Sequence, residues 1–346
     1  MIRRMNKVES SLNKKQKVVV VGGGTGTFAV LSGLKKYHSE LDLSAIVTMA
    51  DAGGSTGRLR DEFGHLPVGD VRMALAALAT DVEAHDQLVR ELFLYRFDKG
   101  NGLSGHNFGN LLLTALTDIL GNEVDAITTA SRILRVRGQV IPVTADNVHL
   151  QAVYDDGVVV VGEHHIDEPP VERQSHRIVS VSLTPTAQLS LPAKETIESA
   201  DKIIFGPGDL YTSILPNCVV EGFAEAVQKS QARLFYVSNL MTKAGQTNNM
   251  SVANHVDALE AVLGRKIDSV IINQDALPTQ LLERYAAEQE FPVVDDMESA
   301  SQQQVIRAHI LAQEETVTKK GDVLRRSLLR HDSAALAQVL MTAWEV

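Results

Sequence analysis

Apolar runs and amphipathic stretches alternate along most of this chain. Residues 17–21 (KVVVV) form a continuous β-branched run, which is typical of a strand buried on both faces, and residues 43–49 (LSAIVTM) form a second apolar run. Between them, residues 28–31 and Leu34 place apolar side chains along one side of a helix. This order predicts a βαβ unit, whose crossover we expect to be right-handed.

The same rhythm continues to the end of the chain. Further helices are predicted at residues 70–80, 87–97 and 110–120, and the last of these is apolar nearly all round, so we expect it to be buried. Further strands are predicted at residues 202–205, 233–237 and 269–272, each beside a segment long enough for a helix. A closing helix is predicted after a cap at Asp332 or Ser333.

One stretch changes period. From about residue 139 to 190, short alternating runs (VHLQAVY, VVVVGE, HRIVSVSL) lie between turn signals and predict a β-rich insertion. The whole pattern predicts a Rossmann-like α/β fold, with a mostly parallel sheet, helices on both faces and this insertion. We expect residues 1–16 to form a flexible leader and residues 17–346 a single domain.

Charge and composition limit the partners. Among 346 residues, 43 Asp and Glu oppose 33 Lys and Arg, and the net charge of -10 argues against duplex nucleic acid or an anionic membrane as the main partner. The single cysteine, Cys218, excludes an internal disulfide and a cysteine zinc cluster, and we interpret it as a packing residue. No stretch approaches the roughly 18 apolar residues of a membrane span. We therefore expect a cytoplasmic protein; the sequence leaves open whether it forms a homo-oligomer.

A glycine loop follows the first predicted strand and precedes a helix. Its residues Gly23, Gly24, Thr25, Gly26 and Thr27 let the backbone approach a ligand, and the N–H groups at the helix start can hold a phosphate. A tight turn without a ligand is the alternative. The loop is not a Walker A motif, because no Gly-Lys-Ser/Thr follows.

A nicotinamide site is a weaker interpretation of the same loop. Gly24, Gly26 and Ala29 fit G-x-G-x-x-A, and Asp51 ends the second strand about where a ribose-binding acid belongs. However, Asp51 begins another glycine loop, in which Gly54, Ser55 and Arg58 could bind a second phosphate or a carboxylate. The alternative for this second loop is a surface loop with solvated arginines.

Two more loops carry candidate ligand groups. One follows the strand at residues 202–205 and contains Gly206, Gly208, Asp209 and Thr212, so we expect it at the carboxyl ends of the parallel strands, where such folds bind ligands. The other precedes the helix at residues 110–120 and contains His106, Asn107 and Asn110, which could contact a ligand or cap that helix.

At this point the chain resembles the bacterial gluconeogenesis-factor family (YvcK-like), which is related to the 2-phospho-L-lactate transferases (CofD-like). The resemblance runs from about residue 17 to the C-terminus. It is carried by KVVVVGGGTGTFAVLSGL, TMADAGGSTGRLRDEFGHLPVGDVR, GNGLSGHNFGNLLL, VRGQVIPVTADNVHLQA, ADKIIFGPGDLYTSILPN and YVSNLMTKAGQTNNM.

The two branches imply different functions. CofD-like enzymes transfer a phospholactyl group from a nucleotide-activated donor to a deazaflavin alcohol with a divalent metal. YvcK-like proteins are associated with cell shape on gluconeogenic carbon sources and bind UDP-sugars such as UDP-N-acetylglucosamine. This chain is more similar to the second branch, which implies a UDP-sugar-binding regulatory protein with protein partners in cell-wall or carbon metabolism.

A transferase stays open as the alternative. It would use Asp51, Asp70 and Asp209 on Mg²⁺, but Ala52 and Asp209 stand where the resemblance leads us to expect a second acid and a serine. Because the loss of a carboxylate weakens a Mg²⁺ site, we expect no resident metal or other cofactor beyond the UDP-sugar ligand.

The resemblance also brings in Asn239 of the NLMT motif, and we consider Tyr285 and Arg330 for the uracil and the outer phosphate, with a core tyrosine and a solvated arginine as the alternatives. His164 and His165 are adjacent in the β-rich stretch, where a strand would point them to opposite faces, so we expect surface histidines and not metal ligands.

Overall fold

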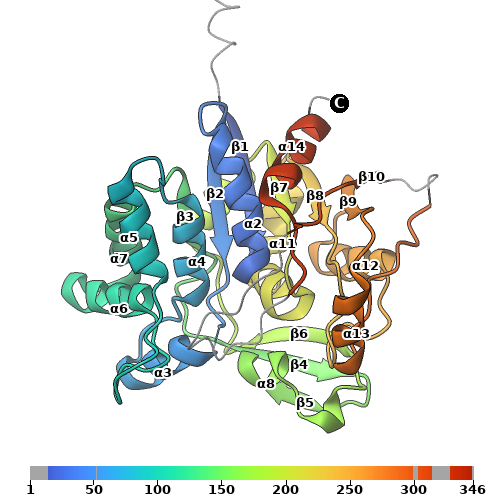
Figure 1. The fold of residues 1–346 in the computed structure, drawn as a ribbon, viewed down its shortest axis with the longest axis horizontal. Coiled ribbons are helices and arrows are strands. Elements are labelled where there is room, and N and C mark those ends of the chain that lie inside the picture. Colours follow the sequence, from blue (N-terminus) through green and yellow to red (C-terminus); the bar gives the residue numbers. More distant parts are fainter. Residues whose placement is uncertain (1–14, 52, 299–302, 314–327, 345–346) are drawn as a thin grey trace, which may run out of the picture.

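A computed structural model describes residues 15–51, 53–298, 303–313 and 328–344 (Figure 1). Residues 1–14 of the expected flexible leader (residues 1–16) therefore lie outside the described residues. Ala52 lies outside them as well. Within the described ranges, no helix combines the length and the apolar character needed to cross a membrane.

The main sheet has seven parallel strands in the order β10-β9-β8-β7-β1-β2-β3. Their bounds are β1 Gln16–Gly22, β2 Leu41–Val47, β3 Gln139–Pro142, β7 Lys202–Phe205, β8 Arg233–Val237, β9 Ser269–Asn273 and β10 Gln304–Ala308. The chain leaves β1 toward β2 and β3, and it later returns to add β7 and the remaining strands on the other side of β1. The point between β1 and β7 is a topological switch point, where open α/β sheets bind ligands at their carboxyl ends.

Helices cover both faces of this sheet, as Figure 1 shows. Val18 and Val20 of β1 face a core shared with α2 (Gly24–Leu34), α4 (Gly69–Leu78) and α14 (Ser333–Trp344). Val19 and Val21 face the opposite core, which α9 (Leu191–Glu198), α11 (Phe223–Lys229) and α12 (Val252–Leu263) share. A strand with both faces buried has no reason to alternate in polarity, which explains the continuous apolar runs. The predicted α/β class is confirmed.

The remaining helices lie in the connections. Between β2 and β3 the chain forms α3 (Gly54–Phe63), α5 (Ala84–Leu94), α6 (Phe108–Leu120) and α7 (Glu123–Ile133), in addition to α4. A π-helical turn (Leu210–Ile214) leads into the short α10 (Leu215–Cys218), and α13 (Thr279–Ala287) precedes β10. Asp332 caps α14, since its Oδ1 accepts a hydrogen bond from the Ala335 N–H at 2.7 Å.

The insertion is a separate three-stranded antiparallel sheet. Its order is β5-β4-β6, from β4 (His149–Tyr154), β5 (Val159–Val161) and β6 (Ile178–Thr184). It lies within the range predicted to be β-rich, but residues 139–142 at the start of that range are β3 of the parallel sheet. Figure 1 shows the small sheet below the carboxyl ends of the main strands.

Two local expectations are wrong. His164 and His165 lie not on a strand but on the short helix α8 (Glu163–Asp167), because Gly162 adopts a φ of 102° and ends the strand before them. The helix predicted at residues 110–120 is not buried all round, since Ile119 is 76% exposed while Thr114 and Thr117 are buried. Both threonine hydroxyls donate to carbonyls four residues earlier, which satisfies them inside the protein.

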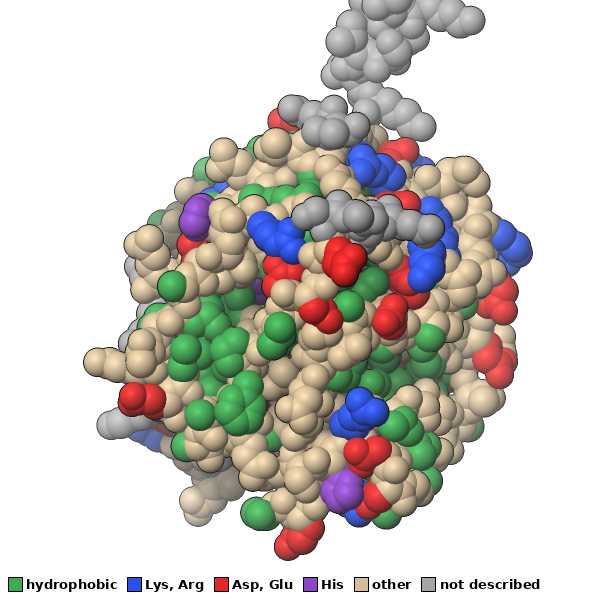
Figure 2. Space-filling model, turned by 90° about the vertical axis from the view of Figure 1, so that its right-hand side faces the viewer, with side chains coloured by type: hydrophobic (Ala, Val, Ile, Leu, Met, Phe, Trp, Pro, Cys, Tyr) green, Lys and Arg blue, Asp and Glu red, His purple; other side chains and the backbone are tan. Residues whose placement is uncertain are grey.

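One face of the molecule carries charges of both signs. On the face drawn in Figure 2, acidic and basic side chains are interspersed, with apolar side chains gathered in groups between them.

Candidate functional site

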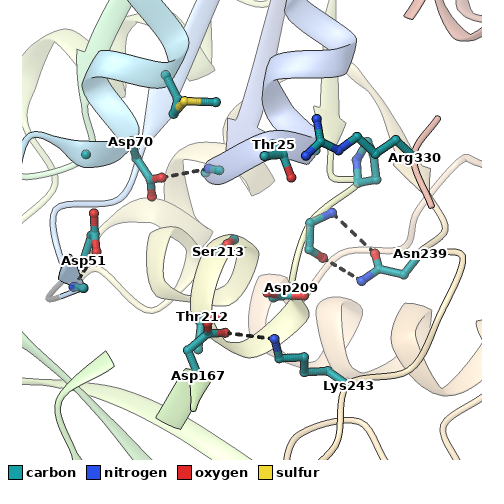
Figure 3. Close-up of a pocket in the computed structure, with 18 of the residues that line it drawn as sticks. Thr25, Asp51, Asp70, Asp167, Asp209, Thr212, Ser213, Asn239, Lys243 and Arg330 are labelled. Carbon is teal, nitrogen blue, oxygen red and sulfur yellow. Dashed lines mark hydrogen bonds and ion pairs between the residues drawn. The ribbon is translucent and has the colours of Figure 1, made fainter. Parts of the chain in front are cut away.

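A cavity of about 470 Å³ lies at the switch point between β1 and β7. Its floor comes from the loops that follow β1 and β7, and its walls come from the ends of β2 and β8, the insertion and the segment before α14. Figure 3 shows Thr25, Asp51, Asp70, Asp209 and Arg330 arranged around this space. Parallel strands end at one edge of a sheet, so four loops far apart in sequence meet here.

The two floor loops contact each other through glycines. Gly24, the first residue of α2, has a φ of 62°, which favours glycine. A Cβ added to Gly26 would lie 2.0 Å from the carbonyl oxygen of Pro207, so Gly26 is required for the two loops to pack. A Gly26→Ala change would displace the β7 loop as well as any ligand, whereas Thr25 can be changed without that contact.

Asn239 fixes the β7 loop from the other side. Its Nδ2 donates to the Gly208 carbonyl at 2.9 Å, and its Oδ1 accepts from the Gly208 N–H at 3.4 Å. Asn239 thus acts on the floor of the cavity by positioning backbone that faces it, and its side chain also lines the space.

Two carboxyl groups lie beside the start of α2. Asp70 Oδ1 accepts a hydrogen bond from the Gly24 N–H at 2.7 Å, and Asp51 Oδ1 accepts one from the Gly53 N–H at 2.8 Å. Burial and, to a smaller extent, the negative charge of Asp51 raise the pKa of Asp70 to about 7, while the hydrogen bond from the Gly24 N–H and the charge of Arg72 oppose the rise. Burial also raises the pKa of Asp51.

A second charged group lies opposite, between the insertion and the β7 loop. Lys243 forms an ion pair with Asp167 at 3.7 Å (Figure 3). Burial raises the pKa of Asp209, with Lys243 opposing and Asp167 adding to the rise. Burial likewise raises the pKa of Glu290 to about 7, again against the charge of Lys243.

Acids outnumber bases around the cavity. Among the residues that the structure describes, eight carboxyl side chains line it, against five Lys and Arg side chains. The acids are Asp51, Asp70, Glu163, Asp167, Glu168, Asp209, Glu288 and Glu290, and the bases are Arg72, Arg96, Lys243, Arg284 and Arg330. A phosphate group can bind here only where raised pKa values keep acids protonated or where a cation offsets their charge.

The segment before α14 forms one wall. The Tyr285 hydroxyl accepts hydrogen bonds from the N–H groups of Leu328, at 2.8 Å, and Leu329, at 3.1 Å. Tyr285 is buried and is among the residues that line the cavity, and its hydroxyl holds the segment that carries Arg330. Burial lowers the pKa of the neighbouring His331 to about 4, so this histidine is neutral and adds no positive charge.

Ser55 and Asn110 line the cavity within a polar network that joins α3, α4 and α6. Ser55 Oγ lies 3.2 Å from His106 Nδ1 and accepts from the Asn107 N–H at 3.2 Å. Asn107 caps α6, and Asn110 Oδ1 accepts from Arg72 Nε at 2.8 Å. His106 and Asn107 therefore hold the helices together behind the lining.

The structure places the predicted site residues in two groups. Those that line the cavity are Gly23, Gly24, Thr25, Gly26, Asp51, Ser55, Asp70, Asn110, Gly208, Asp209, Thr212, Asn239, Tyr285 and Arg330. Those outside the lining are Thr27, Gly54, Arg58, His106, Asn107 and Gly206.

The reasons for the second group are local. Arg58 is exposed and donates to the Ser104 carbonyl at 3.2 Å and 3.3 Å. The Thr27 hydroxyl is buried beneath the turn at Gly22, where an added Cβ would lie 2.6 Å from it. Gly206, with a φ of 73°, makes the sharp turn that leads into the β7 loop.

Sequence reasoning missed Asp167, Lys243 and Glu290, which the fold brings beside Asp209. Lys243 lies directly after the NLMT motif, and this proximity was the available signal. Asp167 comes from the insertion, and nothing local in its sequence links it to the sheet.

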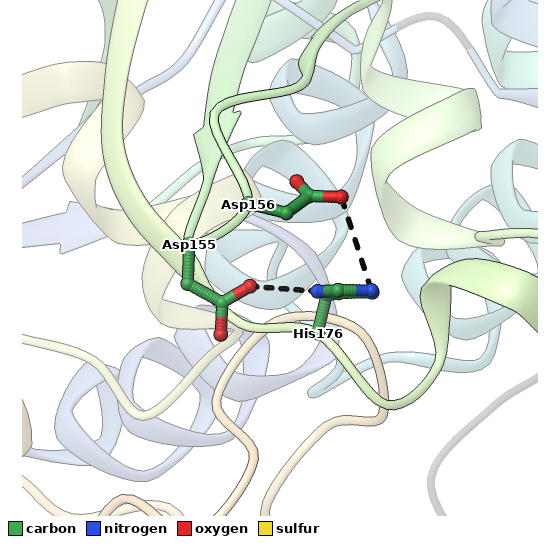
Figure 4. Close-up of side chains that lie close together, drawn as sticks. All are labelled: Asp155, Asp156 and His176. Carbon is green, nitrogen blue, oxygen red and sulfur yellow. Dashed lines mark hydrogen bonds and ion pairs between the residues drawn. The ribbon is translucent and has the colours of Figure 1, made fainter.

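The described residues contain one cluster of three or more possible metal ligands, Asp155, Asp156 and His176, on the insertion (Figure 4). His176 Nδ1 lies 2.8 Å from Asp155 Oδ1, whereas its Nε2 lies 3.8 Å from Asp156 Oδ2. Each ring nitrogen thus faces a different carboxylate, although one ligand atom from each of the three residues lies within 4.8 Å of the others. Arg173 pairs with Asp156 at 2.8 Å and lowers the pKa of that acid to about 2. The cluster is an exposed ion-pair network.

Comparisons with known proteins agree on one protein family for this chain. The family model described as 2-phospho-L-lactate transferase CofD matches residues 18–311. The chain is similar to the gluconeogenesis factor of Bacillus subtilis strain 168, with 43% identity over 334 residues, which cover 95% of this chain and 98% of the relative. It is also similar to the gluconeogenesis factor of Listeria innocua, with 43% identity over 274 residues, covering 79% of this chain and 82% of the relative.

A solved structure agrees with these relatives. The crystal structure of a protein from Bacillus halodurans matches with a TM-score of 0.84 and 37% identity, covering 95% of this chain and 100% of that one.

Proposed function

This chain belongs to the CofD family, within which it groups with the gluconeogenesis factors, and from that premise we propose that it binds a UDP-sugar at the β1–β7 switch point and acts as a cytoplasmic regulatory protein. The ligand we propose is UDP-N-acetylglucosamine. The observation that carries the proposal is the open first turn of α2 facing a cavity of about 470 Å³, which falls within the usual size range of small-molecule sites.

The pyrophosphate is assigned to the start of α2. Asp70 already satisfies the Gly24 N–H, so a phosphate would use the N–H groups of Thr25 and Gly26 and the Thr25 hydroxyl. The first-turn N–H groups of a helix lack partners within the helix, and the helix dipole favours a negative charge there. Arg330 supplies a positive charge from the wall opposite, and the Tyr285 ring offers a flat apolar surface for the base.

The acids set the conditions for this binding. A nucleotide diphosphate brings negative charge toward Asp51 and Asp70, and their raised pKa values reduce the repulsion near neutral pH. We therefore expect metal-free binding to weaken as the pH rises through about 7, where Asp70 becomes ionised.

The first test is calorimetric titration of the full chain with UDP-N-acetylglucosamine, with and without Mg²⁺, followed by chromatography of the recovered ligand. Thr25→Val removes one hydroxyl from the site and should weaken binding about 10-fold, the equivalent of one hydrogen bond to a charged group. Thr128→Val, on the exposed face of α7, is the matched control. If a folded Thr25→Val variant bound the ligand as tightly as wild type does, the assignment of the pyrophosphate to the start of α2 would be refuted.

A second function is favoured by one observation, the adjacent carboxyl groups of Asp51 and Asp70. Together with phosphate oxygens of a nucleotide donor, they would hold Mg²⁺, and the ion would supply positive charge to the transferred group. Within the described part of the cavity, however, no three acids bring their oxygens within 4.8 Å of one another. Release of UDP or UMP only with Mg²⁺ would establish this transferase; return of intact ligand would support the regulatory protein.

The likeness to gluconeogenesis factors also supports a role in cell shape on gluconeogenic carbon sources, through protein partners in cell-wall or carbon metabolism. A strain that lacks the protein should lose its normal shape on such a source and recover it with the wild-type chain. Failure of Thr25→Val to restore the shape, at equal protein level, would tie the phenotype to the ligand. Full recovery of the shape with Thr25→Val would show that the shape phenotype does not depend on ligand binding.

A further inference from the structure

A second cleft, of about 270 Å³, lies at the other end of α2 from the cavity described above. It is formed by the end of α2 and by Lys35 and Lys36 in the turn that follows that helix. Its other lining residues are Thr80, Asp81, Arg90 of α5, Arg137 before β3 and Ser333 of α14. None of its lining residues belongs to the first cavity.

This cleft is strongly basic in a protein whose net charge is -10. Among the described residues that line it, four are basic, Lys35, Lys36, Arg90 and Arg137, and one is acidic, Asp81. Four cations and one carboxylate leave a net charge of +3. These charged residues come from four separate parts of the chain, so the charge is produced by the fold and not by a basic run in the sequence.

The acid of this cleft, Asp81, forms an ion pair with Lys35. Lys35 is 7% exposed, and its Nζ donates to Asp81 Oδ2 at 2.9 Å and to the Ala79 carbonyl at 2.8 Å. Burial lowers the pKa of Lys35, and the nearby charges of Arg90 and Arg137 lower it further, while Asp81 opposes them. The positive charges therefore repel one another, and the carboxylate of Asp81, which is hydrogen-bonded to Lys35, offsets only part of them.

The two arginines contact a backbone carbonyl, an aromatic ring and an imidazole. Arg90 Nε donates to the Ala76 carbonyl at 2.9 Å, and its guanidinium lies over the Phe28 ring, 5.5 Å from the centroid. Arg137 Nη1 lies 3.1 Å from His38 Nδ1. Among the described residues these are the side-chain hydrogen bonds of the two guanidiniums, and neither is made to a carboxylate. Most of their donors thus remain available at the cleft.

Hydroxyl groups complete the lining. Ser32 and Thr80 face the same cleft, and Ser32 Oγ is buried without a hydrogen-bond partner among the residues that the structure describes. A buried polar atom without a partner costs free energy unless a ligand or water satisfies it. Its position beside several cations indicates a ligand that carries both negative charge and hydrogen-bonding groups.

We propose that this cationic cleft, lined by Lys35, Lys36, Arg90 and Arg137, is a second binding site, specific for a small phosphorylated metabolite of about the size of a sugar phosphate. Arginine forks and lysine point charges are the usual partners of phosphate oxygens, and the two hydroxyls would contact the polar remainder of the ligand. The site does not depend on what binds between β1 and β7.

The test uses inorganic pyrophosphate as the probe, since it carries the required charge and no base. Wild type and the Lys36→Gln/Arg137→Gln variant are titrated by calorimetry at low salt, and hydrogen exchange locates the protected backbone. Both substituted residues reach the cleft from its rim, whereas Lys35 is left in place because it is buried. The control is Lys229→Gln/Arg132→Gln, which removes two exposed charges elsewhere.

We expect the cleft variant to bind pyrophosphate at least about 10-fold more weakly than wild type, and the control to bind as wild type does. Protection should appear at residues 28–37 and 84–94. Arg90→Gln serves as a second variant if the first has a lowered melting temperature.

Two results would overturn the proposal: unchanged affinity in both folded cleft variants, or protection confined to the glycine loop at residues 22–27. Because the UDP-sugar proposal also places a pyrophosphate at the start of α2, the location of the protection tells the two sites apart: binding at the glycine loop protects residues 22–27, and binding at the cleft protects residues 28–37 and 84–94. Thr25→Val should leave pyrophosphate binding at the cleft intact. The Lys36→Gln/Arg137→Gln variant changes none of the residues that line the first cavity.

Discussion

Asp70→Asn is the substitution that most directly tests the electrostatics of the main cavity. The amide oxygen can still accept the hydrogen bond that Asp70 Oδ1 accepts from the Gly24 N–H, so the start of α2 keeps its partner. What the variant loses is an ionisable group whose pKa burial raises from its ordinary 3.8 to about 7.

The sign follows from which state holds the proton. Below pH 4, Asp70 is protonated in both the folded and the unfolded protein and contributes nothing to the pH dependence. Between pH 4 and about 7 the unfolded chain releases the proton while the folded protein keeps it, so the free energy of unfolding falls as the pH rises.

The size of the effect comes from the same two values. A rise from 3.8 to about 7 corresponds to about 4 kcal/mol, which is an upper limit because water in the cavity screens part of the charge. Asp70→Asn should therefore match wild type near pH 4 and be more stable than wild type at pH 8 by up to about 4 kcal/mol.

Urea denaturation at pH 4.5, 6, 7 and 8 measures this difference directly. Asp257→Asn, which changes an exposed carboxylate of α12, is the control and should follow wild type. A constant difference between Asp70→Asn and wild type across this range would refute the assignment of a raised pKa. Under the UDP-sugar proposal, the variant should also lose the decrease in metal-free affinity through pH 7.

Three further substitutions test which residues position the backbone around the cavity and which lie away from the ligand. Tyr285→Phe removes the hydroxyl that accepts from two backbone N–H groups, so it should cost about 1–3 kcal/mol of stability and weaken UDP-sugar binding, as denaturation and calorimetry would show; unchanged stability would contradict the anchor. Asn239→Ala frees the Gly208 peptide and should lower both stability and affinity, with hydrogen exchange increasing first at residues 206–213; unaltered exchange there would argue against it. Arg58→Ala should change affinity by less than about 2-fold, because Arg58 contacts the Ser104 carbonyl away from the cavity, and a larger loss would return it to the site.

The fold class and the convergence of the glycine loops could be predicted because both depend on local patterns. A continuous valine run such as residues 17–21 is needed only where both faces of a strand are buried, and loops at the carboxyl ends of parallel strands must meet. The position of each loop relative to its strand was therefore sufficient to bring Thr25, Asp51 and Asp209 to one cavity.

The misses concern orientation and distant contacts. Arg58 is close to Asp51 in sequence, but the turn of α3 directs its guanidinium to the Ser104 carbonyl, and a loop motif does not fix that direction. Asp167 reaches Lys243 only because the insertion folds back below the sheet, which no pattern around residue 167 indicates. His164 follows four valines, yet Gly162 ends the strand first.

The backbone between Leu328 and Ser333 has a consequence for both clefts. Its first four residues line the large cavity, while Ser333 lines the basic one and touches α2 closely enough that a Cβ on Gly33 would lie 1.9 Å from the Ser333 carbonyl oxygen. A single short segment is thus a boundary of two compartments. If occupying one compartment shifts that segment, the affinity of the other changes, and thermodynamic reciprocity requires the same factor in the reverse direction. The affinity of each compartment can be measured with the other compartment empty and occupied, and the two resulting factors must be equal.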